Sequence, residues 1–427
     1  MHKEADKRVV ITGIGPVTSI GTGRQAFWSN LLNNHANIRR IPARFENDYI
    51  FKSKYYAPFP EFTLEEFGFP SRMNMLMEEP SKLAVIGTKL ALQDAGIDPD
   101  QGTFKNSESA ERIAVVLGNA ICSLEAGFEA FANHTQSVNE KSLKKYDYGK
   151  RFNRMVIPAI MPDSAAAWVA IHLGICGETF TLNTSCASGT YAIGEAYRKI
   201  VDGYADMVVT GGVECLKDST GTIMRGFDTL STLTKSENGF PMPFSKNRSG
   251  FLFAEGGGCI LILERLDKAL KRNTQIYAEI GGYESSSDAY NLVQIEPSGK
   301  QIKRMLNKLI SDNKIDYFNT HGTATTLNDE FEKSMIQEVF GKQSDQPLIN
   351  STKGTLGHTI GASGAIEAAV TAMSIKYSKV HRNESEEVFD NLNLVTESMD
   401  AEINNALSAS YGFGGHNAAL LLKKWSG

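Results

Sequence analysis

The stretch TFTLNTSCASGTYAIGEAYRKIV, residues 179–201, joins a short β-rich run to a pattern with helical periodicity. Cys186 lies at the junction, among Thr, Ser, Ala and Gly. Most cysteines behave as small buried hydrophobes. A thiol at the start of a helix, however, meets unpaired backbone N–H groups and the positive end of the helix dipole, which lower its pKa. Cys186 is therefore either a core residue or a nucleophile, and as a nucleophile it is expected to have a lowered pKa.

Segments of the same kind alternate along the whole chain. Short β-branched or apolar runs are followed by stretches with helical periodicity, from RVVITGIG near the start to NNALSASYGFGGHNAALLLKK near the end. Strands that alternate with helices predict a mostly parallel sheet that is covered on both faces. Both halves begin with a β-rich run and carry polar residues at strand ends. We therefore expect a duplicated α/β architecture, although no strict repeat is visible in the residues.

Two segments interrupt this alternation. Residues 42–80 are rich in Pro, Phe and Tyr, and are expected to form an irregular excursion on the surface. Residues 133–154 are polar and basic, which is typical of an exposed loop or short helix. This charge run is either a solvated surface or a docking site for an acidic carrier protein. The chain has no flexible or Pro-rich linker, so its halves are expected to form one rigid body.

Composition limits the classes of function. The chain has 427 residues, of which 41% are hydrophobic and 22% charged, as in an ordinary soluble enzyme. Its net charge of −5 argues against nucleic acid as the main partner. The start lacks the apolar core of a signal peptide, and no apolar run is long enough to span a bilayer. The cysteines are odd in number and lack CxxC spacing, which indicates free thiols in a reducing cytoplasm and no zinc site; they are Cys122, Cys176, Cys186, Cys215 and Cys259.

One segment near the start of the chain partly matches the dinucleotide-binding fingerprint. TGIGPVTSIG follows a predicted strand and contains Gly13 and Gly15, as a dinucleotide-binding loop would. The third glycine of that fingerprint would fall at position 18, which is Thr18, and no acidic residue ends a second strand at the required distance. We interpret the motif as a tight turn and exclude NAD binding.

Two histidines lie in settings like that of Cys186, just after a predicted strand and among small residues. They are His321 in NTHGTATTLNDEFE and His358 in STKGTLGHTIGASGAIE. Lys353 precedes His358 by five residues in the same loop. A single histidine of this kind is more often a satisfied core residue, but the combination favours a functional site. His416, in GFGGHNAA, is expected to order the backbone beside a glycine turn.

One thiol, two imidazoles and an ammonium suit a reaction that twice builds negative charge on a carbonyl oxygen. The first build-up comes when the thiolate attacks a thioester, and backbone N–H groups can hold that oxyanion. The second comes when a carboxylate leaves as carbon dioxide and an enolate remains. Two neutral imidazoles could donate N–H bonds to the enolate oxygen. The nearby lysine could keep both rings neutral through charge repulsion.

From RVVITGIG to ASYGFGGHNAALLL the chain resembles the β-ketoacyl-[acyl-carrier-protein] synthases, on the ketoacyl synthase II branch that includes type II polyketide ketosynthases. NTSCASG is similar to the family's nucleophile segment, and the two histidine stretches are similar to its histidine motifs. The resemblance implies the α/β thiolase fold, with duplicated βαβ halves in five αβαβα layers and a dimer formed through the first half. The halves would be residues 1–265, which carry the cysteine, and 266–427, which carry the His and Lys motifs.

The resemblance also implies a role for each matching residue. Cys186 would accept the acyl chain, while His321 and His358 would drive decarboxylation of a malonyl group and stabilise the enolate. Lys353 would order and polarise the histidines, in an ion pair with Glu367.

Further positions match the family's binding and supporting residues. The backbone N–H groups of Cys186 and Phe413 would form the oxyanion hole, and the Phe413 side chain would gate the acyl channel. Thr323 and Thr325 would hydrogen-bond the phosphopantetheine arm. Gly412 and Gly414 would flank Phe413 in the loop of the oxyanion hole and gate. Ile121 would lie in the acyl pocket, and Asp329 and Glu332 would support the first histidine motif.

The partner implied is an acyl carrier protein, whose phosphopantetheine holds the substrates. No cofactor or metal of the enzyme's own is expected, and neither a nucleic acid nor a membrane partner. The assembly would be a homodimer, or a heterodimer with a chain-length-factor-like subunit, in the cytoplasm.

The chain departs from the family pattern outside the catalytic positions. Ser245 and Ser249 replace the usual acids of the PFSKNRSG segment, and Asn291 stands where relatives often have His. Asp228 stands where many members carry a basic residue for carrier docking. Three other basic residues are then expected to contact the carrier: Lys150, Arg151 and Arg225. These departures indicate a specialised partner or substrate.

Other acyl-transfer enzymes differ in residue type. A thiolase would need a second cysteine near the C-terminus, but the last cysteine is Cys259. The ketoacyl synthase III branch would have Asn at position 358. A chain-length factor, which shares the fold without catalysis, characteristically lacks the nucleophile. A housekeeping synthase of fatty acid elongation and the ketosynthase of a type II polyketide system both remain open.

Overall fold

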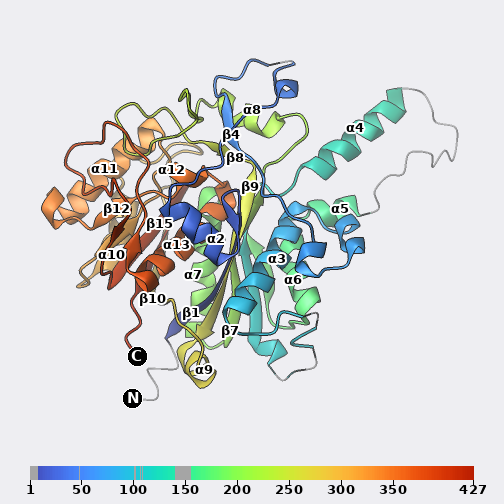
Figure 1. Ribbon diagram of the computed structural model, residues 1–427, viewed down its shortest axis with the longest axis horizontal. Coiled ribbons are helices and arrows are strands. Elements are labelled where there is room, and N and C mark those ends of the chain that lie inside the picture. The colour runs from blue at the N-terminus through green and yellow to red at the C-terminus, as the bar shows by residue number, and fades with distance from the viewer. Residues whose placement is uncertain (1–7, 48, 101, 106, 108, 140–154) are drawn as a thin grey trace.

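An eleven-stranded mixed sheet runs through the computed structural model (Figure 1). The structure describes residues 8–427 except 48, 101, 106, 108 and 140–154. The strands lie in the order β12-β11-β15-β16-β10-β1-β9-β7-β5-β6, and β2 (Gly21–Thr22) pairs with β1. The first half of the chain supplies β1 (Val9–Thr18), β5 (Ile113–Gly118), β6 (Thr179–Leu182), β7 (Met207–Cys215) and β9 (Gly256–Arg265). The second half supplies β10 (Ala278–Ser287), β11 (Tyr317–Asn319), β12 (Leu348–Asn350), β15 (Asn405–Gly412) and β16 (His416–Lys423).

The two halves have the same topology. In the first, β1 pairs antiparallel with β9, β9 antiparallel with β7, and β7, β5 and β6 are parallel. In the second, β10, β16, β15, β11 and β12 repeat these directions in the same order. The halves meet where β1 and β10 pair at the middle of the sheet. The predicted duplication is confirmed.

The expectation of a mostly parallel sheet is wrong. Only the outer strands of each half pair in parallel, and the central strands are antiparallel. The short Gly-rich turn between β15 and β16 shows the physical reason, because a connection of this length can join only antiparallel neighbours.

Helices cover the sheet in three layers, so that the architecture is αβαβα as predicted. α3 (Glu79–Asp94) and α6 (Ser164–Leu173) pack on the outer face of the first half. α10 (Lys300–Ile310) and α11 (Thr326–Phe340) pack on the second half. α7 (Ser188–Val201) and α13 (Ser363–Tyr377) lie between the halves. Their buried faces are rich in alanine, which lets both helices fit between the two halves of the sheet: Ala192 and Ala196 on α7, and Ala365, Ala368, Ala369 and Ala372 on α13.

The remaining elements form the edges and connections. The helices are α2 (Arg24–Leu32), α4 (Glu125–Asn139), α5 (Val156–Ile160), α8 (Thr222–Thr229), α9 (Leu266–Lys271) and α12 (Lys353–Leu356). Two small sheets consist of β3 (Arg39–Arg40), β4 (Tyr55–Ala57) and β8 (Phe253–Ala254), and of β13 (Lys379–Val380) and β14 (Met399–Asp400). Short 3-10 helices are η1 (Ala43–Glu46), η2 (Glu65–Phe67), η3 (Ser71–Met75), η4 (Ala110–Arg112), η5 (Ser185–Ala187), η6 (Gln343–Asp345) and η7 (Ile360–Ala362). None of the helices in the described part of the chain has the length and apolar character needed to cross a membrane.

The two interrupting segments differ in character. Residues 42–80 are irregular, as expected, but they are anchored to the body through β4 and through buried aromatic side chains, Phe45, Phe51, Phe59 and Phe69. Residues 133–139 form the end of α4, which projects from the body in Figure 1. Residues 140–154 lie outside the described part of the chain.

A short repeat marks the duplication in the sequence itself. TSCASG at 184–189 and TIGASG at 359–364 each begin with a 3-10 turn and continue into the inner helix, α7 or α13. Ser185 and Ile360 occupy the same place and both have a positive φ, 53° and 47°. Ser188 and Ser363 each accept a hydrogen bond from the backbone N–H of the repeat's threonine. The division into residues 1–265 and 266–427 remains our proposal.

Candidate active site

Cys186 sits in the 3-10 turn between β6 and α7. The turn depends on Ser185, whose positive φ reverses the chain, and on Ser188, whose hydroxyl accepts from Thr184 N at 2.9 Å and donates to Ser185 O at 2.7 Å. Gly412, at the end of β15, lies against this turn. A Cβ at position 412 would stand 2.7 Å from Thr184 O and 3.2 Å from Cys186 N. Only glycine therefore lets the 412–415 loop lie against the cysteine turn.

The second half places an equivalent turn beside the first. Glycines at the starts of α7 and α13 allow this close approach, because a Cβ at Gly189 would meet Ala365 N at 2.7 Å and one at Gly364 would meet Thr190 Oγ1 at 2.1 Å. His358 precedes the second turn. The cysteine and this histidine, 172 positions apart in the sequence, are therefore brought together by contact between two helix starts.

His321 follows β11 in a loop that buried carboxylates hold. Glu332 on α11 accepts hydrogen bonds from His321 N at 3.0 Å and from Gly322 N. Asp329 accepts from Ala324 N at 3.0 Å, where Ala324 has a φ of 63°. Burial raises the pKa of Glu332 to about 8 and that of Asp329 to about 6. These side chains act on the backbone of the loop and so position the ring of His321.

Lys353 lies behind His321. Its Nζ donates to His321 O at 2.7 Å, lies 3.3 Å from His321 Nδ1, and forms an ion pair with Glu367 of α13. Both members of the pair are 2% exposed, and burial raises the pKa of Glu367 to about 7. Because Nδ1 of His321 faces a donor, Nε2 is the nitrogen that carries the ring's proton.

His358 is equally enclosed. Its backbone N–H donates to Leu252 O at 2.9 Å, and its ring packs edge-to-face on Phe251 with centroids 5.0 Å apart. The rings of His358 and His321 are 5.6 Å apart at an angle of 84°. Nδ1 of His358 lies 2.9 Å from Ser363 Oγ. Both histidines thus present their remaining ring nitrogen toward a shared space.

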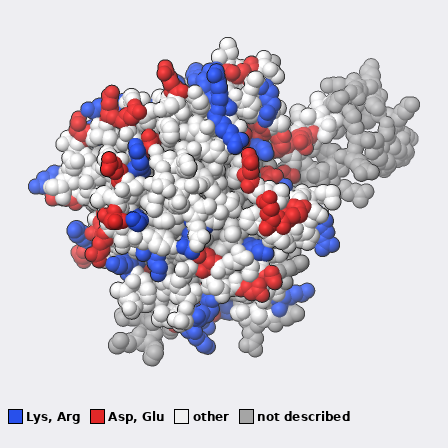
Figure 2. Space-filling model, viewed as in Figure 1, with Lys and Arg blue, Asp and Glu red and all other residues white. Residues whose placement is uncertain are grey.

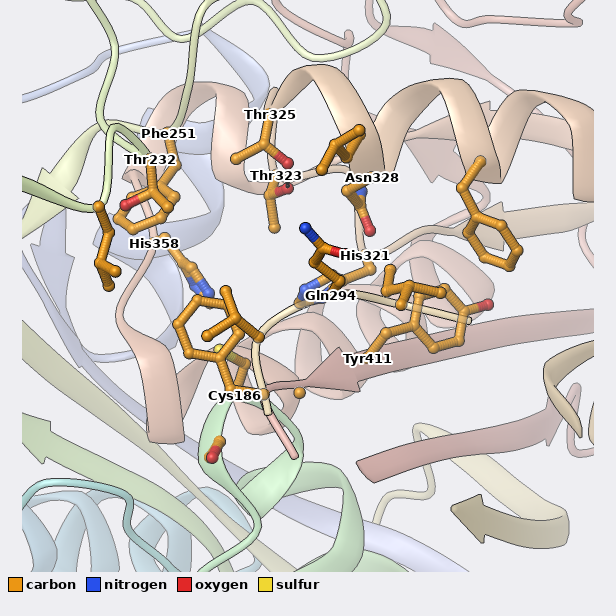
Figure 3. A pocket seen from close by; sticks show the side chains of 18 of the residues that line it. Cys186, Thr232, Phe251, Gln294, His321, Thr323, Thr325, Asn328, His358 and Tyr411 are labelled. Carbon is orange, nitrogen blue, oxygen red and sulfur yellow. Dashed lines mark hydrogen bonds between the residues drawn. The ribbon is translucent and has the colours of Figure 1, made fainter. Parts of the chain in front are cut away.

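That space is a cavity of about 740 Å³. Figure 3 shows Cys186, His321 and His358 around it, with Thr323, Thr325 and Asn328 on the opposite wall. The hydroxyls of Thr323 and Thr325 are 3.0 Å apart. Other lining residues among the predicted positions are Ile121, Gly412 and Phe413, whereas Gly414 is not in the wall. Four of the predicted residues lie outside the wall of the cavity: Asp329, Glu332, Lys353 and Glu367.

The expected low pKa of Cys186 is wrong for this structure. Burial raises its pKa to about 11, although the charge of Lys353 and the backbone N–H of Phe413 oppose the rise. Cys186 is 5% exposed, so the loss of solvation outweighs the favourable charges. The predicted neutrality of the histidines is confirmed. Burial first, and then the positive charge of Lys353, hold the pKa values of His321 and His358 well below 6.5.

Replacing Lys353 with alanine is expected to raise the pKa of His321 toward its ordinary value of about 6.5. The substitution removes the positive charge nearest to the ring and leaves Glu367 as a buried unpaired carboxylate. NMR titration of ring signals would show His321 gaining a proton at a higher pH than in the original protein. Loss of one member of a buried ion pair should also lower the free energy of unfolding by about 3 to 5 kcal/mol.

The double variant Lys353→Ala/Glu367→Gln is the control for this prediction. It removes the unpaired carboxylate and should recover much of the lost stability. Its His321 pKa should stay above that of the original protein, because the lysine charge is still missing. An unchanged His321 titration in both variants would contradict the electrostatic role of Lys353.

The positions expected to dock a carrier have different surroundings. Lys150 and Arg151 lie outside the described residues. Arg225 is exposed on α8 and stacks over Tyr49 at 4.7 Å. Asp228 is buried, and its carboxylate accepts from Tyr49 Oη at 2.8 Å and from the backbone N–H groups of Lys52 and Ser53. Asp228 therefore holds the 49–53 loop and is not a surface contact. Figure 2 shows acidic and basic side chains interspersed on one face of the protein.

The other departures are structural as well. Ser245 is fully buried and accepts from Glu386 N at 3.0 Å, while Ser249 accepts from Lys235 N at 2.8 Å and reaches the cavity wall. Asn291 accepts from the backbone N–H groups of Val293 and Gln294, which ties the loop that carries Gln294 to the cavity. His416 pairs with Gly412 across the β15–β16 hairpin and lies against Tyr191.

Sequence reasoning missed several residues that shape the site. Glu214, at the end of β7, accepts hydrogen bonds from the backbone N–H groups of Ala120, Ile121, Cys122 and Gly361, and so joins the two halves beside the cavity. Asn328 donates to Asp329 and Glu332, and Tyr411 packs on His321. Ser363 contacts His358. The repeat TxxASG could have signalled Ser363, whereas no sequence signal marks the others. No cluster of ligands suited to a metal ion occurs among the described residues.

Comparison with known proteins agrees with this geometry. The sequence matches the families described as Beta-ketoacyl synthase, N-terminal domain, over residues 6–269, and Beta-ketoacyl synthase, C-terminal domain, over residues 277–385. It is 33% identical over 431 aligned positions to the 3-oxoacyl-[acyl-carrier-protein] synthase 2 of Staphylococcus aureus (strain COL), with 98% of this chain and 99% of the relative covered.

Two solved structures are also similar. The ishigamide ketosynthase/chain length factor has a TM-score of 0.84 and 25% identity, over 98% of this chain and 99% of that chain. A ketosynthase structure described as a type II PKS acyl-carrier protein in complex with its ketosynthase bound to the hexaketide has a TM-score of 0.83 and 26% identity, over 98% of this chain and 99% of that chain. The chain therefore belongs to the β-ketoacyl synthase family of condensing acyltransferases.

Proposed function

We propose that this protein carries out the decarboxylative condensation of a malonyl thioester with an acyl chain held on Cys186. The single observation that carries the proposal is the opening of Cys186, His321 and His358 on one cavity, with the Lys353–Glu367 pair behind His321. A hydrolase would have no use for this second histidine and lysine.

The first step is transfer of the acyl group. The sulfur of Cys186 attacks the thioester carbon, the carbon–sulfur bond to the carrier breaks, and the thiol proton ends on the carrier's sulfur. The backbone N–H groups of Cys186 and Phe413 hold the negative charge on the carbonyl oxygen. Because the pKa of Cys186 is raised, its thiol is protonated before the substrate binds. The proton therefore leaves the sulfur only during the attack and ends on the carrier's sulfur.

The second step forms the nucleophile for condensation. Carbon dioxide leaves the malonyl group, and the electron pair of the broken carbon–carbon bond passes into an enolate. Neutral His321 and His358 donate N–H bonds to the enolate oxygen, each worth about 3 kcal/mol. The enolate carbon then attacks the acyl carbonyl and a carbon–carbon bond forms. The carbon–sulfur bond to Cys186 breaks, and the released sulfur takes up a proton from solvent to restore the thiol. The product is a 3-oxoacyl thioester.

The substrates are proposed to arrive on the phosphopantetheine of an acyl carrier protein. The names of the Staphylococcus relative and of the carrier complex support this partner. Thr323 and Thr325 line the cavity and would hydrogen-bond the arm, Ile121 would contact the acyl chain, and Phe413 would gate it. Arg225 would contact the carrier from the exposed side of α8, whose residue Phe227 lines the cavity. The enzyme would use no cofactor of its own.

The assembly is proposed to be a dimer, with either a second copy or a chain-length-factor-like subunit. The similarity to a ketosynthase/chain length factor structure favours the second arrangement, in a polyketide rather than a housekeeping fatty acid pathway. Because this chain carries Cys186, it would be the catalytic member of such a pair. We also propose a cytoplasmic location, since all five cysteines are free thiols.

The proposal is tested with acyl-carrier and malonyl-carrier as substrates. Mass spectrometry after incubation with acyl-carrier should find the acyl group on the Cys186 peptide. Addition of malonyl-carrier should then release carbon dioxide and discharge the adduct as a 3-oxoacyl-carrier. An adduct that is discharged only as the free acid would indicate a hydrolase instead.

A further inference from the structure

Ser363, at the start of α13, contacts one of the two histidines of the site. Its Oγ lies 2.9 Å from Nδ1 of His358 and is buried with it. The same oxygen accepts a hydrogen bond from Thr359 N at 3.1 Å and lies 3.0 Å from Thr359 Oγ1. The ring of His358 is neutral, so one of its two nitrogens carries a proton and the other does not.

Two arrangements of protons satisfy these contacts. In one, Nδ1 carries the proton and donates it to Ser363, which leaves Nε2 as an acceptor. In the other, Ser363 donates to Nδ1, and the proton on the ring is at Nε2. Only the second arrangement lets His358 donate a hydrogen bond into the cavity. It also aligns the hydroxyls in one direction, from Thr359 to Ser363 to the ring, and hydrogen bonds in such chains strengthen one another.

The equivalent serine of the first half shows what is special about Ser363. Ser188 also accepts from the backbone N–H of its threonine, but it donates its own proton to Ser185 O at 2.7 Å. At the same place in the second half, the contact of the serine hydroxyl is Nδ1 of His358. Both serines therefore accept from the backbone of their turn, but the hydroxyl of Ser363 contacts a histidine nitrogen where that of Ser188 donates to a backbone carbonyl.

We propose that Ser363 is a positioning residue that donates to Nδ1 of His358 and thereby fixes the ring in the Nε2–H form. This inference rests on the proposed function, because the Nε2–H form is the one that can hold an enolate oxygen. Without the serine, both forms of the ring become populated, and the fraction able to donate into the cavity falls. The residue touches no substrate and acts only through the histidine.

The experiment uses the full chain with ¹⁵N-labelled histidine, and the signals of His358 are identified by their loss in His358→Asn. In the original protein the proton should be on Nε2. In Ser363→Ala the Nδ1–H form should appear, and carbon dioxide release from malonyl-carrier should fall about tenfold, the effect of one hydrogen bond. The rate of acyl transfer to Cys186 should stay within about twofold, because His358 takes no part in that step.

Ser188→Ala is the matched control, since it removes the turn contact without touching a histidine. It should leave His358 in the Nε2–H form, whatever it does to acyl transfer. A proton on Nδ1 in the original protein would overturn the proposal, and so would an identical His358 spectrum in Ser363→Ala. The first of these outcomes can be read from the original protein even if a variant fails to fold. It is also independent of activity, so failure of the proposed function would be seen separately as the absence of an acyl adduct.

Discussion

Replacing Cys186 with alanine is expected to abolish the acyl-enzyme and to reduce condensation at least about 10³-fold. Among the described residues that line the cavity, Cys186 is the only cysteine, and alanine cannot replace its nucleophilic sulfur. His321, His358 and Lys353 remain in place, so carbon dioxide release from malonyl-carrier should continue. Intact mass after incubation with acyl-carrier measures the first effect, and analysis of 3-oxoacyl products measures the second.

Cys122→Ala is the matched control for this experiment. Cys122 and Cys186 are both 5% exposed, but Cys122 is not in the wall of the cavity. Its backbone N–H binds Glu214, and this contact survives the substitution. The Cys122 variant should form the acyl adduct at the original rate. An adduct that persists in Cys186→Ala and is lost in Cys122→Ala would show that Cys122, and not Cys186, is the nucleophile.

Replacing His358 with alanine is expected to leave acyl transfer intact and to slow decarboxylation by about 10² to 10³-fold. Removal of one preorganised donor to an oxyanion has an effect of this size. The oxyanion hole of the first step consists of backbone N–H groups from Cys186 and Phe413, which the substitution does not touch. The measurements are adduct formation from acyl-carrier and release of labelled carbon dioxide from malonyl-carrier.

The two steps serve as each other's control in this variant. A general loss of structure would slow both, whereas loss of the enolate donor slows only the second. His321→Ala should show the same split, since the two rings face one cavity. Carbon dioxide release at the original rate from His358→Ala would contradict the enolate role of this histidine.

Much of the fold could be predicted from the sequence, because it depends on local patterns. β9 contains the apolar run CILIL, and α7 repeats buried residues at helical spacing, so both elements can be predicted without coordinates. The directions in which the strands pair are harder to predict from the sequence. The antiparallel pairs of each half depend on the path of the chain between strands. The hydrophobic pattern predicts where a strand lies, but not in which direction it pairs. The repeat of TSCASG in TIGASG is too short to indicate a duplication from the sequence alone, because only its Thr, Ala, Ser and Gly are identical.

The residue types of the site could be predicted, since Cys186, His321, Lys353 and His358 each lie in a sequence segment of small and polar residues that follows a strand. Their ionisation was predicted only in part. The helix-start position suggested a low pKa for Cys186, but the pKa also depends on desolvation, which is a property of the packed interior. Glu214 gave no signal because it ends an ordinary strand, and its four backbone partners come from both halves of the chain.

The sequence by itself determined the chemical groups of this protein: a thiol, two imidazoles, an ammonium and their supporting carboxylates, each in a segment whose local pattern places it at a strand end. Only the tertiary structure decided that the thiol and both imidazoles share one cavity with the ammonium behind it, that the thiol is protonated at rest, and that Ser363 faces a histidine. The physical reason is that covalent order specifies which groups exist, whereas their distances and solvation arise from the contact of α7 with α13. That contact depends on Gly189 and Gly364, which allow two helix starts to approach within a few ångströms.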